Sequence, residues 1–474
     1  MGSFAIFKPI YGALPEVRTP EQKPALKQRL LWTGIALLAF FVLGNISLIG
    51  LTAQSAGQLS QLQVVLASQI GSLLTVGIGP IVLASIILQL LVGGGIIKLD
   101  LSNPADKTEF SGMQKLLAII LSFFEALAFS LTGFITPAPG MLPLVVLQVA
   151  IGSIILLYLD EVVSKYGVGS GIGLFIAAQV SGEIVWRIFS PIDVAQNFNI
   201  AQGNGLLFLF FREVATNVLN AFIVALLPIL FTLLIFFVVV YAEGIHVNIP
   251  ITMGRKGTGG RYPVKFLYVS NMPVILAVAL FANFSIWAAL TKGVPFVGAF
   301  IGGIAAIVIP PYGLVQQIFL EGISPTIFDQ MIQSITTFQL IGLGGSIIHA
   351  FLYIIILVVA ATIFGRFWIE LGGQGPDKVA AQLQKAGMSI PGFRRDPRVI
   401  KQVLDRYIPT ITILGSAFVG LLAGLADLTG AIGSGTGILL TVGIVYRLYE
   451  ELAREQLMEM HPMLGRLFGQ GGRF

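Results

Sequence analysis

Residues 217–241 read NVLNAFIVALLPILFTLLIFFVVVY and contain no charged side chain. A helix needs about 20 apolar residues to cross the hydrocarbon core of a bilayer, so this stretch is long enough to span a membrane. Windows of about 19 residues with the same apolar character recur along the chain. They predict ten spans, at residues 31–51, 74–96, 114–136, 141–162, 171–188, 217–241, 266–290, 339–365, 408–427 and 430–448.

The composition agrees with a membrane protein rather than a soluble one. Of the 474 residues, 55% are hydrophobic and 11% are charged, and the mean hydropathy is +0.89. Soluble domains carry about 25% charged residues and could not bury so much apolar surface. Length alone would suggest about three soluble domains. The recurring spans instead predict one all-α, polytopic membrane domain.

No residue pattern in the chain indicates catalysis, a metal or a cofactor. There is no cysteine, which excludes disulfides and thiolate metal sites, and His246, His349 and His461 lack the spacing of ligands. A Walker-type loop, a Ser/His/Asp or paired-carboxylate arrangement and a His-Glu-x-x-His helix are all missing from the sequence. We therefore expect neither an enzyme nor a bound cofactor.

The distribution of positive charge orients the spans. Residues 294–316 are apolar but glycine-rich and contain Pro310 and Pro311, so we expect an external loop that partly re-enters the membrane. Ten spans place both chain ends on one side, and every Lys and Arg except Arg187, Arg212 and Lys292 then falls on that side. By the positive-inside rule, residues 1–30, the loops 242–265 and 366–407 and the tail 449–474 are cytoplasmic, and 189–216 is an external loop.

The segment before the second span is polar but uncharged. Between residues 44 and 97 there is no Asp, Glu, Lys or Arg. Residues 58–67 fit two to three helical turns with Leu59, Leu62, Val65 and Leu66 on one side. A short half-buried helix and an interfacial loop on the outer leaflet both fit this pattern.

Several side chains inside the spans draw attention. The pairs Ile78 with Val82 and Ile172 with Ile176 are spaced i, i+4 on one helix face, a spacing that by itself favours ordinary packing. The polar residues at membrane depth are few, and interhelical hydrogen bonding is the simplest role for the amides. They are Glu125, Gln89, Gln148, Asn271, Asn283 and His349. Their scarcity weighs against ion-coupled transport.

The two large cytoplasmic loops are strongly basic. One carries Arg255, Lys256, Arg261 and Lys265 among glycines; the other has a helical-looking run at 377–387 and then Arg394, Arg395 and Arg398. Such charge suits a phosphate backbone, but it also suits anionic lipid headgroups.

An ordered set of motifs resembles a known family. GIGPIV (77–82), YLDEVVSKYGVGSGIGLFIA (158–177), YAEGIHVNIPI (241–251) and GSGTGILLTVGIVYR (433–447) are similar to the archaeal and eukaryotic type of the SecY family of protein-conducting channels. The resemblance runs from about residue 15 to residue 462. It implies ten helices in two inverted five-helix halves, 31–188 and 217–448, around a central pore in the cell membrane.

The resemblance also implies roles for individual residues. The pore ring falls on Ile78, Val82, Ile172, Ile176, Ile275 and Leu440, with Leu439 as the alternative to Leu440. The plug falls on 58–67 and includes Gln58, Leu59, Leu62, Val65, Leu66 and Ala67. A lateral gate between the spans 74–96 and 114–136 on one side and 266–290 and 339–365 on the other would be tuned by Gln89, Asn271 and Asn283, although Leu83 stands where other members can have a polar residue.

The implied activity is passive conduction of polypeptide. The resemblance predicts the central subunit of the Sec translocase, working with a SecE-like subunit, a small beta (SecG-like) subunit, the ribosome, signal-sequence-bearing nascent chains and the lipid bilayer. Arg255, Lys256, Arg261, Arg394 and Arg395 would form the docking surface for the ribosome. A secondary transporter of a small solute and a scaffold or insertase without a pore are the competing hypotheses.

Overall fold

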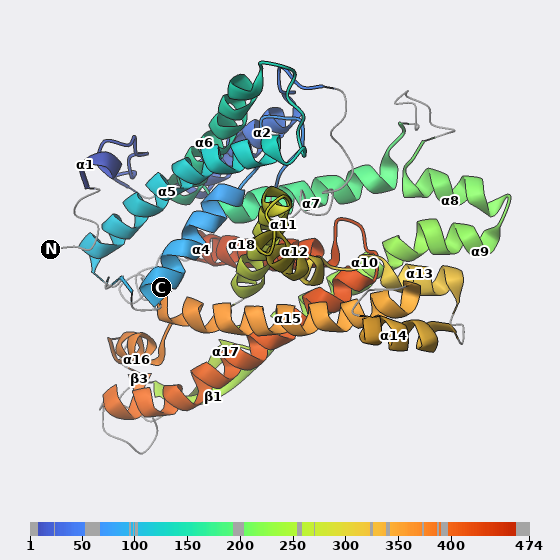
Figure 1. Cartoon of the computed structure of the whole chain (residues 1–474). Helices are drawn as coiled ribbons and strands as arrows, with labels where there is room; N and C mark the ends of the chain where they lie inside the picture. The colour runs from blue at the N-terminus through green and yellow to red at the C-terminus, as the bar shows by residue number, and fades with distance from the viewer. Residues whose placement is uncertain are drawn as a thin grey trace.

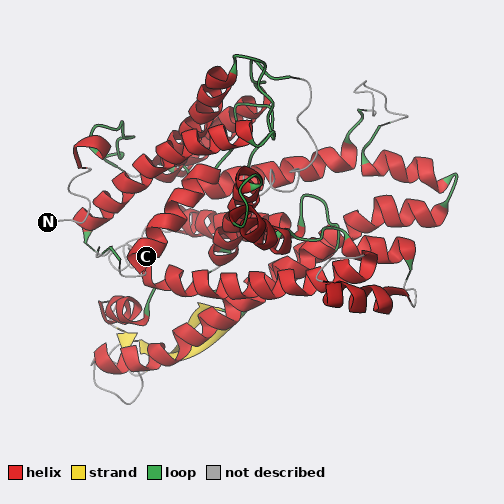
Figure 2. Cartoon of the chain, in the orientation of Figure 1, coloured by secondary structure: helices red, strands yellow, loops and turns green. Residues whose placement is uncertain are grey.

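The chain is almost entirely helical in the computed structural model (Figures 1 and 2). The structure describes residues 8–22, 24–52, 67–93, 96–97, 99, 103–192, 203–253, 258–269, 271–322, 326–337, 342–371, 374–385, 388–389 and 397–460. Long apolar helices pack side by side, and a small sheet lies at one end of the molecule (Figure 2). This arrangement confirms the predicted all-α membrane fold.

The first part of the chain forms one set of contacting helices. After the short α1 (Lys8–Tyr11) come α2 (Leu26–Asn45), α4 (Gly79–Gly93), α5 (Pro104–Leu131), α6 (Leu142–Tyr166) and α7 (Gly171–Phe189). Contacts join α4 to α5, α5 to α6, α2 to both α6 and α7, and α6 to α7. We call α2, α4, α5, α6 and α7 the first group; α2, α5 and α6 lie together in the upper part of Figure 1.

The second part of the chain is longer and carries more short elements. Its helices are α8 (Leu206–Val214), α9 (Val218–Ala221), the π-helical turn η3 (Phe222–Leu226), α10 (Leu227–Glu243), α11 (Met272–Thr291), α12 (Val297–Val308), α13 (Leu314–Glu321), α14 (Thr326–Thr337), α15 (Gly342–Leu371), α16 (Pro376–Lys385), α17 (Pro397–Leu428) and α18 (Gly435–Met460). Contacts join α10 and α17 to α18, and join α11, α15 and α17 to one another. We call α10, α11, α15, α17 and α18 the second group.

Eight stretches of helix in the described residues are long and apolar enough to cross a membrane. They correspond to eight of the ten predicted spans. The other two predicted spans correspond to α4, which has 15 residues, and to α18, whose C-terminal half is charged. Helix α4 is short because its predicted span begins in a turn, where Gly77 has a left-handed φ of +61°. Ten crossings therefore stay a prediction.

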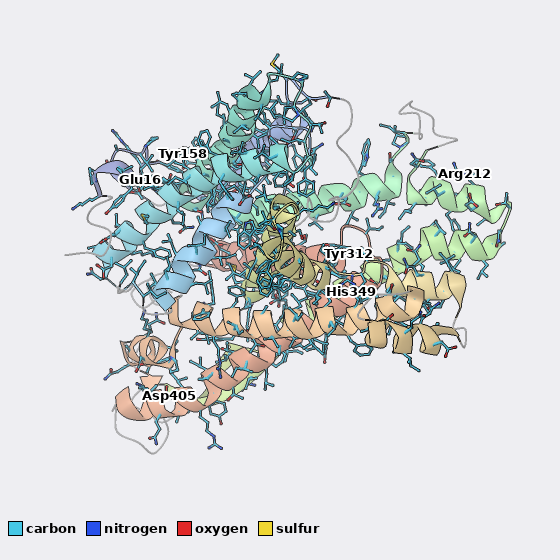
Figure 3. All side chains as sticks on the ribbon, in the orientation of Figure 1. Glu16, Tyr158, Arg212, Tyr312, His349 and Asp405 are labelled. Atoms are coloured by element: carbon cyan, nitrogen blue, oxygen red, sulfur yellow. The ribbon has the colours of Figure 1, made fainter. Side chains whose placement is uncertain are left out.

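Two segments outside the spans differ in detail from simple loops. Residues 294–316 contain α12, which has 12 residues and ends just before Pro310 and Pro311. The His349 imidazole on α15 lies 3.3 Å from the Ile307 carbonyl oxygen and holds α12 against α15 (Figure 3). The predicted external loop 189–216 contains the nine-residue helix α8, which begins with the apolar run LLFLFF.

The N-terminal segment is held against α5 and the end of α6. The Lys165 ammonium pairs with Glu16 at 2.9 Å and with Glu161 at 2.9 Å. Lys115 pairs with Glu161 at 2.9 Å and lies over the Tyr158 ring, and Glu16 and Tyr158 occupy the same end of the bundle in Figure 3. These contacts fix the N-terminal segment against the helices. From the sequence it was characterised only by its charged residues and prolines.

The two large loops predicted to be cytoplasmic join in one small sheet. Strand β1 (His246–Met253) pairs antiparallel with β2 (Thr258–Lys265), from His246 opposite Lys265 to Met253 opposite Thr258. Strand β3 (Met388–Ser389), from the other loop, pairs with the end of β1 and gives the order β2-β1-β3. Beneath the sheet, α16 and α17 share an apolar cluster with Val264 of β2. The helix at 377–387 was predicted; the sheet was not.

Candidate functional site

The residues of the predicted pore ring lie in one hydrophobic cluster. Ile78, Val82, Ile176, Ile275 and Leu440 are all buried in it. Ile172 is half-buried and packs against the same cluster. Four of these residues lie at α4 and α7 of the first group, and two on α11 and α18 of the second. The cluster is larger than the ring and also includes Leu439, so the structure brings the predicted residues together without by itself assigning them a pore.

A turn before α4 sets the direction of the first pair. The left-handed φ of Gly77 reverses the backbone, and the Ile78 carbonyl oxygen then accepts hydrogen bonds from the Ile81 and Val82 amides, each at 3.1 Å. Pro80 has no amide hydrogen and fits the first turn, where no intrahelical acceptor exists. Ile78 and Val82 therefore lie one turn apart in the cluster.

Asp427, which was not among the predicted site residues, fixes the start of α18. Its buried carboxylate, at the C-terminal end of α17, accepts hydrogen bonds from the Thr436 amide at 2.8 Å, from the Thr436 hydroxyl, and from the Tyr353 hydroxyl of α15 at 2.8 Å. Thr436 lies in the first turn of α18, one turn before Leu440. A single carboxylate thus ties three helices together beside the predicted ring. The sequence signal was an Asp between an apolar run and the turn TGAIGSG.

Removing the Asp427 carboxylate should destabilise this junction. We expect Asp427→Ala to lower the free energy of unfolding by at least about 2 kcal/mol, because it leaves buried Tyr353 and Thr436 donors without an acceptor. Asp427→Asn keeps one carbonyl oxygen and should cost less. Unfolding titrations of the purified protein measure both values. Equal losses for the two variants would show that the hydrogen bonds do not hold the junction.

Asn271 fastens the beginning of α11 to α18. Its buried side-chain amide donates a hydrogen bond to the Leu439 carbonyl oxygen at 3.1 Å. A methyl group added at Gly443 would lie 1.8 Å from the Asn271 Nδ2 atom, so the two helices meet where only hydrogen fits. The described partner of this predicted gate residue therefore lies on α18, next to Leu440, rather than on α4 or α5.

Gly443→Ala should force these two helices apart. Since the added carbon overlaps the Asn271 amide, we expect a loss of about 1–3 kcal/mol in the free energy of unfolding. The matched control is Gly302→Ala on α12, where nothing lies within 4 Å of the added carbon and helix propensity favours alanine. Thermal unfolding in detergent compares the two variants. A Gly443→Ala protein as stable as the Gly302→Ala protein would contradict the close approach.

The helices predicted to flank a lateral gate are neighbours. Helix α4 contacts α11 and α15, and α5 contacts α11; we call this boundary the gate seam. Gln89 donates within α4 to the Ser85 hydroxyl at 2.9 Å, and Asn283 donates within α11 to the Ala279 carbonyl oxygen at 2.9 Å. Within residues 79–93, 110–131, 272–291 and 342–369, no hydrogen bond or ion pair joins the first group to the second. The seam is therefore closed by apolar packing.

Glu125 lies inside the first group, where α5 packs against the start of α4. Its side chain on α5 is buried, and a methyl group added at Gly79 would lie 2.8 Å from the Glu125 Oε2 atom. Among the described residues neither carboxylate oxygen has a hydrogen-bond partner. Glu125 was predicted to lie inside a span but without a role, because its contact with the start of α4 depends on tertiary packing.

The predicted plug and docking residues fall mostly outside the described part of the chain. Gln58, Leu59, Leu62, Val65 and Leu66 lie outside it, whereas Ala67 is described. Ala67 is buried in the same hydrophobic cluster as Ile78, so the last residue of the predicted plug lies in the core that holds the predicted ring.

Of the predicted docking residues, Arg255, Lys256, Arg394 and Arg395 lie outside the described residues. The backbone of Arg261 pairs with Pro250 across β2 and β1. The described residues contain no group of three or more His, Asp or Glu side chains that could hold a metal ion.

Comparisons with known proteins agree with this arrangement. The family model SecY matches residues 72–449, and the plug domain of Sec61p matches residues 38–71, a range that includes the predicted plug. The protein translocase subunit SecY of Methanothermobacter thermautotrophicus is 46% identical over 98% of both chains, and that of Methanocaldococcus jannaschii is 44% identical over 98% of this chain and 99% of its own.

Solved structures show the same likeness. A structure described as that of a protein conducting channel is 42% identical, covers 96% of this chain and 98% of its own, and has a TM-score of 0.80. Sec61 in the canine ribosome-channel complex is 42% identical with the same coverage and a TM-score of 0.77. With its family model matched over most of its length and relatives above 40% identity along the whole chain, this protein is a member of the SecY family of protein translocase subunits.

Proposed function

We propose that this chain is the central pore-forming subunit of a protein translocase, conducting unfolded polypeptides across the membrane and releasing transmembrane segments sideways into lipid. The observation that carries the proposal is the joint burial of Ile78, Val82, Ile176, Ile275 and Leu440, from helices of both groups, in one aliphatic cluster. Aliphatic side chains exclude water and ions when closed, and they offer a passing chain no hydrogen-bonding site at which to stall.

The gate seam supports the sideways release. Because apolar packing closes it, α4 and α5 can separate from α11 and α15 without leaving broken ion pairs in the membrane. The apolar face of a transmembrane segment, or lipid, can then replace the lost contacts. A seam closed by buried charges would instead cost several kcal/mol for each charge left unpaired.

The proposed ribosome partner is supported by the similar proteins and by the positive charge of the two large loops. One relative, Sec61, is solved in a ribosome-channel complex, and the two joined loops of this chain carry the predicted basic residues. We propose that these loops face the cytoplasm, as the positive-inside pattern predicts, and dock a ribosome. SecE-like and small beta subunits would complete the complex. No nucleotide-binding motif is present in the sequence, so the proposed channel is passive and not an enzyme.

The direct test is translocation by a purified complex. The chain would be reconstituted with its two partner subunits into vesicles and supplied with ribosomes that carry a signal-bearing nascent chain. We expect the nascent chain to become protected from added protease, and a nascent chain without a signal to stay accessible. Solute uptake driven by an ion gradient, without protected polypeptide, would overturn the proposal in favour of a secondary transporter.

A further inference from the structure

An arginine at the start of α2 joins the two groups of helices. The Arg29 guanidinium donates to the Gly167 carbonyl oxygen at 2.7 Å, at the C-terminal end of α6. It also pairs with Glu451 at 2.8 Å and with Glu455, both on α18. Glu451 and Glu455 lie one turn apart on the same face of α18, so the planar fork of Arg29 reaches both carboxylates at once. One side chain thus bridges the first and second groups.

Close packing surrounds this bridge. The Thr33 hydroxyl, one turn after Arg29, donates to the Arg29 carbonyl oxygen at 2.9 Å and accepts the Val168 amide at 3.0 Å. A methyl group added at Gly169 would lie 2.6 Å from Leu448 of α18, and Gly169 has a left-handed φ of +73°. Helix α7, which follows, also contacts α18. We call this boundary, of α2 and α7 with α18, the clamp seam.

The ion pairs at the clamp seam are shielded from solvent. The Arg29 side chain is 11% exposed and that of Glu455 is 14% exposed, although Glu451 is 39% exposed. A pair of this kind is screened less by salt than a surface pair, and removing one partner leaves a charge that water reaches poorly. The clamp seam is therefore held by directional charged contacts, whereas the gate seam is held by apolar packing.

From this contrast we propose that Arg29, Glu451 and Glu455 form an ionic clamp that keeps the clamp seam closed while the gate seam opens. Arg29 is thus a positioning residue, distant from the passing polypeptide, that makes one boundary between the groups the fixed edge of the movement. The proposal rests on the proposed function, since it assigns a residue to the opening of that channel.

The clamp can act on the predicted ring through two helices. Leu440 and Glu451 both lie on α18, about 16 Å apart along the axis at about 1.5 Å per residue. On the other side, Gly167 ends α6 four residues before α7 begins, and the Ile172 amide of α7 donates to the Asp160 carboxylate of α6 at 2.9 Å. Releasing Arg29 would therefore let α18 tilt relative to α7 and shift Leu440 away from Ile172 and Ile176.

The first test is Arg29→Met, which keeps much of the side-chain length and removes the charge. In vesicles containing the complete complex, we expect the ion leak of the resting channel to rise about tenfold. The matched control is Glu450→Gln. Glu450 is the neighbour of Glu451 on α18, but it pairs with Lys265 at 2.5 Å inside the second part of the chain. This variant also breaks one ion pair of α18, and the leak should stay at the wild-type level.

A covalent replacement for the clamp separates its role from general stability. The chain has no cysteine, so Arg29→Cys with Glu455→Cys can be joined specifically by a short bifunctional maleimide. We expect the unjoined double variant to leak, and the joined one to seal again and to translocate at the wild-type rate, because a fixed edge need not open. Loss of translocation on joining would overturn the clamp, as would an Arg29→Met channel that leaks no more than wild type.

The outcomes also distinguish this proposal from the function on which it rests. A wild-type complex that translocates, with clamp variants that match it in leak, overturns the clamp alone. A wild-type complex that protects no nascent chain in the same vesicles overturns the proposed function, and the clamp proposal with it.

Discussion

Replacing Ile176 by asparagine is expected to make the resting channel leak ions, raising its conductance at least about tenfold over the wild type. Ile176 is fully buried in the cluster that holds the predicted ring. A carboxamide there has no apolar group to replace the lost packing and recruits water, because burying an unpaired amide costs several kcal/mol. Planar-bilayer recordings of the reconstituted complex give the conductance directly.

Two variants make this result specific. Ile176→Val keeps an aliphatic side chain and should keep the seal. Val149→Asn places the same amide at a fully buried position of α6, in a different hydrophobic cluster, and should destabilise the fold without opening a leak. If Ile176→Asn leaked no more than Val149→Asn, the aliphatic cluster would be ordinary membrane core and the pore ring would be misplaced.

Joining the gate seam covalently should stop translocation. Phe129 of α5 and Ile286 of α11 are buried in one hydrophobic cluster, and the two helices are in contact. We expect the variant with cysteines at both positions, joined by a short bifunctional maleimide, to translocate less than about a tenth as much as the unjoined protein. A transmembrane helix has a diameter of about 10–12 Å and cannot leave between helices that are held in contact. Protease protection of a nascent membrane protein measures the effect.

The matched control uses the same position on α5. Cysteines at Phe129 and Val145 lie in the same cluster, but both belong to the first group, on α5 and α6. Joining them should leave translocation close to the unjoined level. A block of equal size in both joined variants would mean that rigidity in general, and not the gate seam, limits the reaction.

Hydropathy was enough to find the helices buried in lipid, and it failed where a helix continues into water. The predicted span 141–162 matches α6 (Leu142–Tyr166), and 171–188 matches α7 (Gly171–Phe189). Helix α5, however, begins at Pro104 rather than at residue 114, because Asn103 caps its first turn and the following turns are charged. Helix α18 likewise runs on to Met460, past the predicted end at 448, through the acidic residues that pair with Arg29 and Lys265.

Local sequence patterns did not predict contacts between residues that are far apart in the chain. Spacing alone favoured ordinary packing for Ile78 and Val82, and only the family resemblance set them in a ring. Asp427 with Tyr353, and Arg29 with Glu451, each unite helices far apart in the chain, and no periodicity signals such a pair. The hairpin of β1 and β2 was also missed, since the loop 242–265 was characterised only by its glycines and basic residues.

The pairing of β3 with β1 joins the two loops in a single sheet. This sheet is connected through the chain to four helices of the second group: β1 follows α10, β2 leads into α11, and β3 lies between α15 and α17. None of its strands is connected directly to a helix of the first group. A force on either loop would therefore reach all four helices through the sheet. A partner therefore needs to bind only one of the two loops, and the force it exerts acts at the boundaries between the second group and the first.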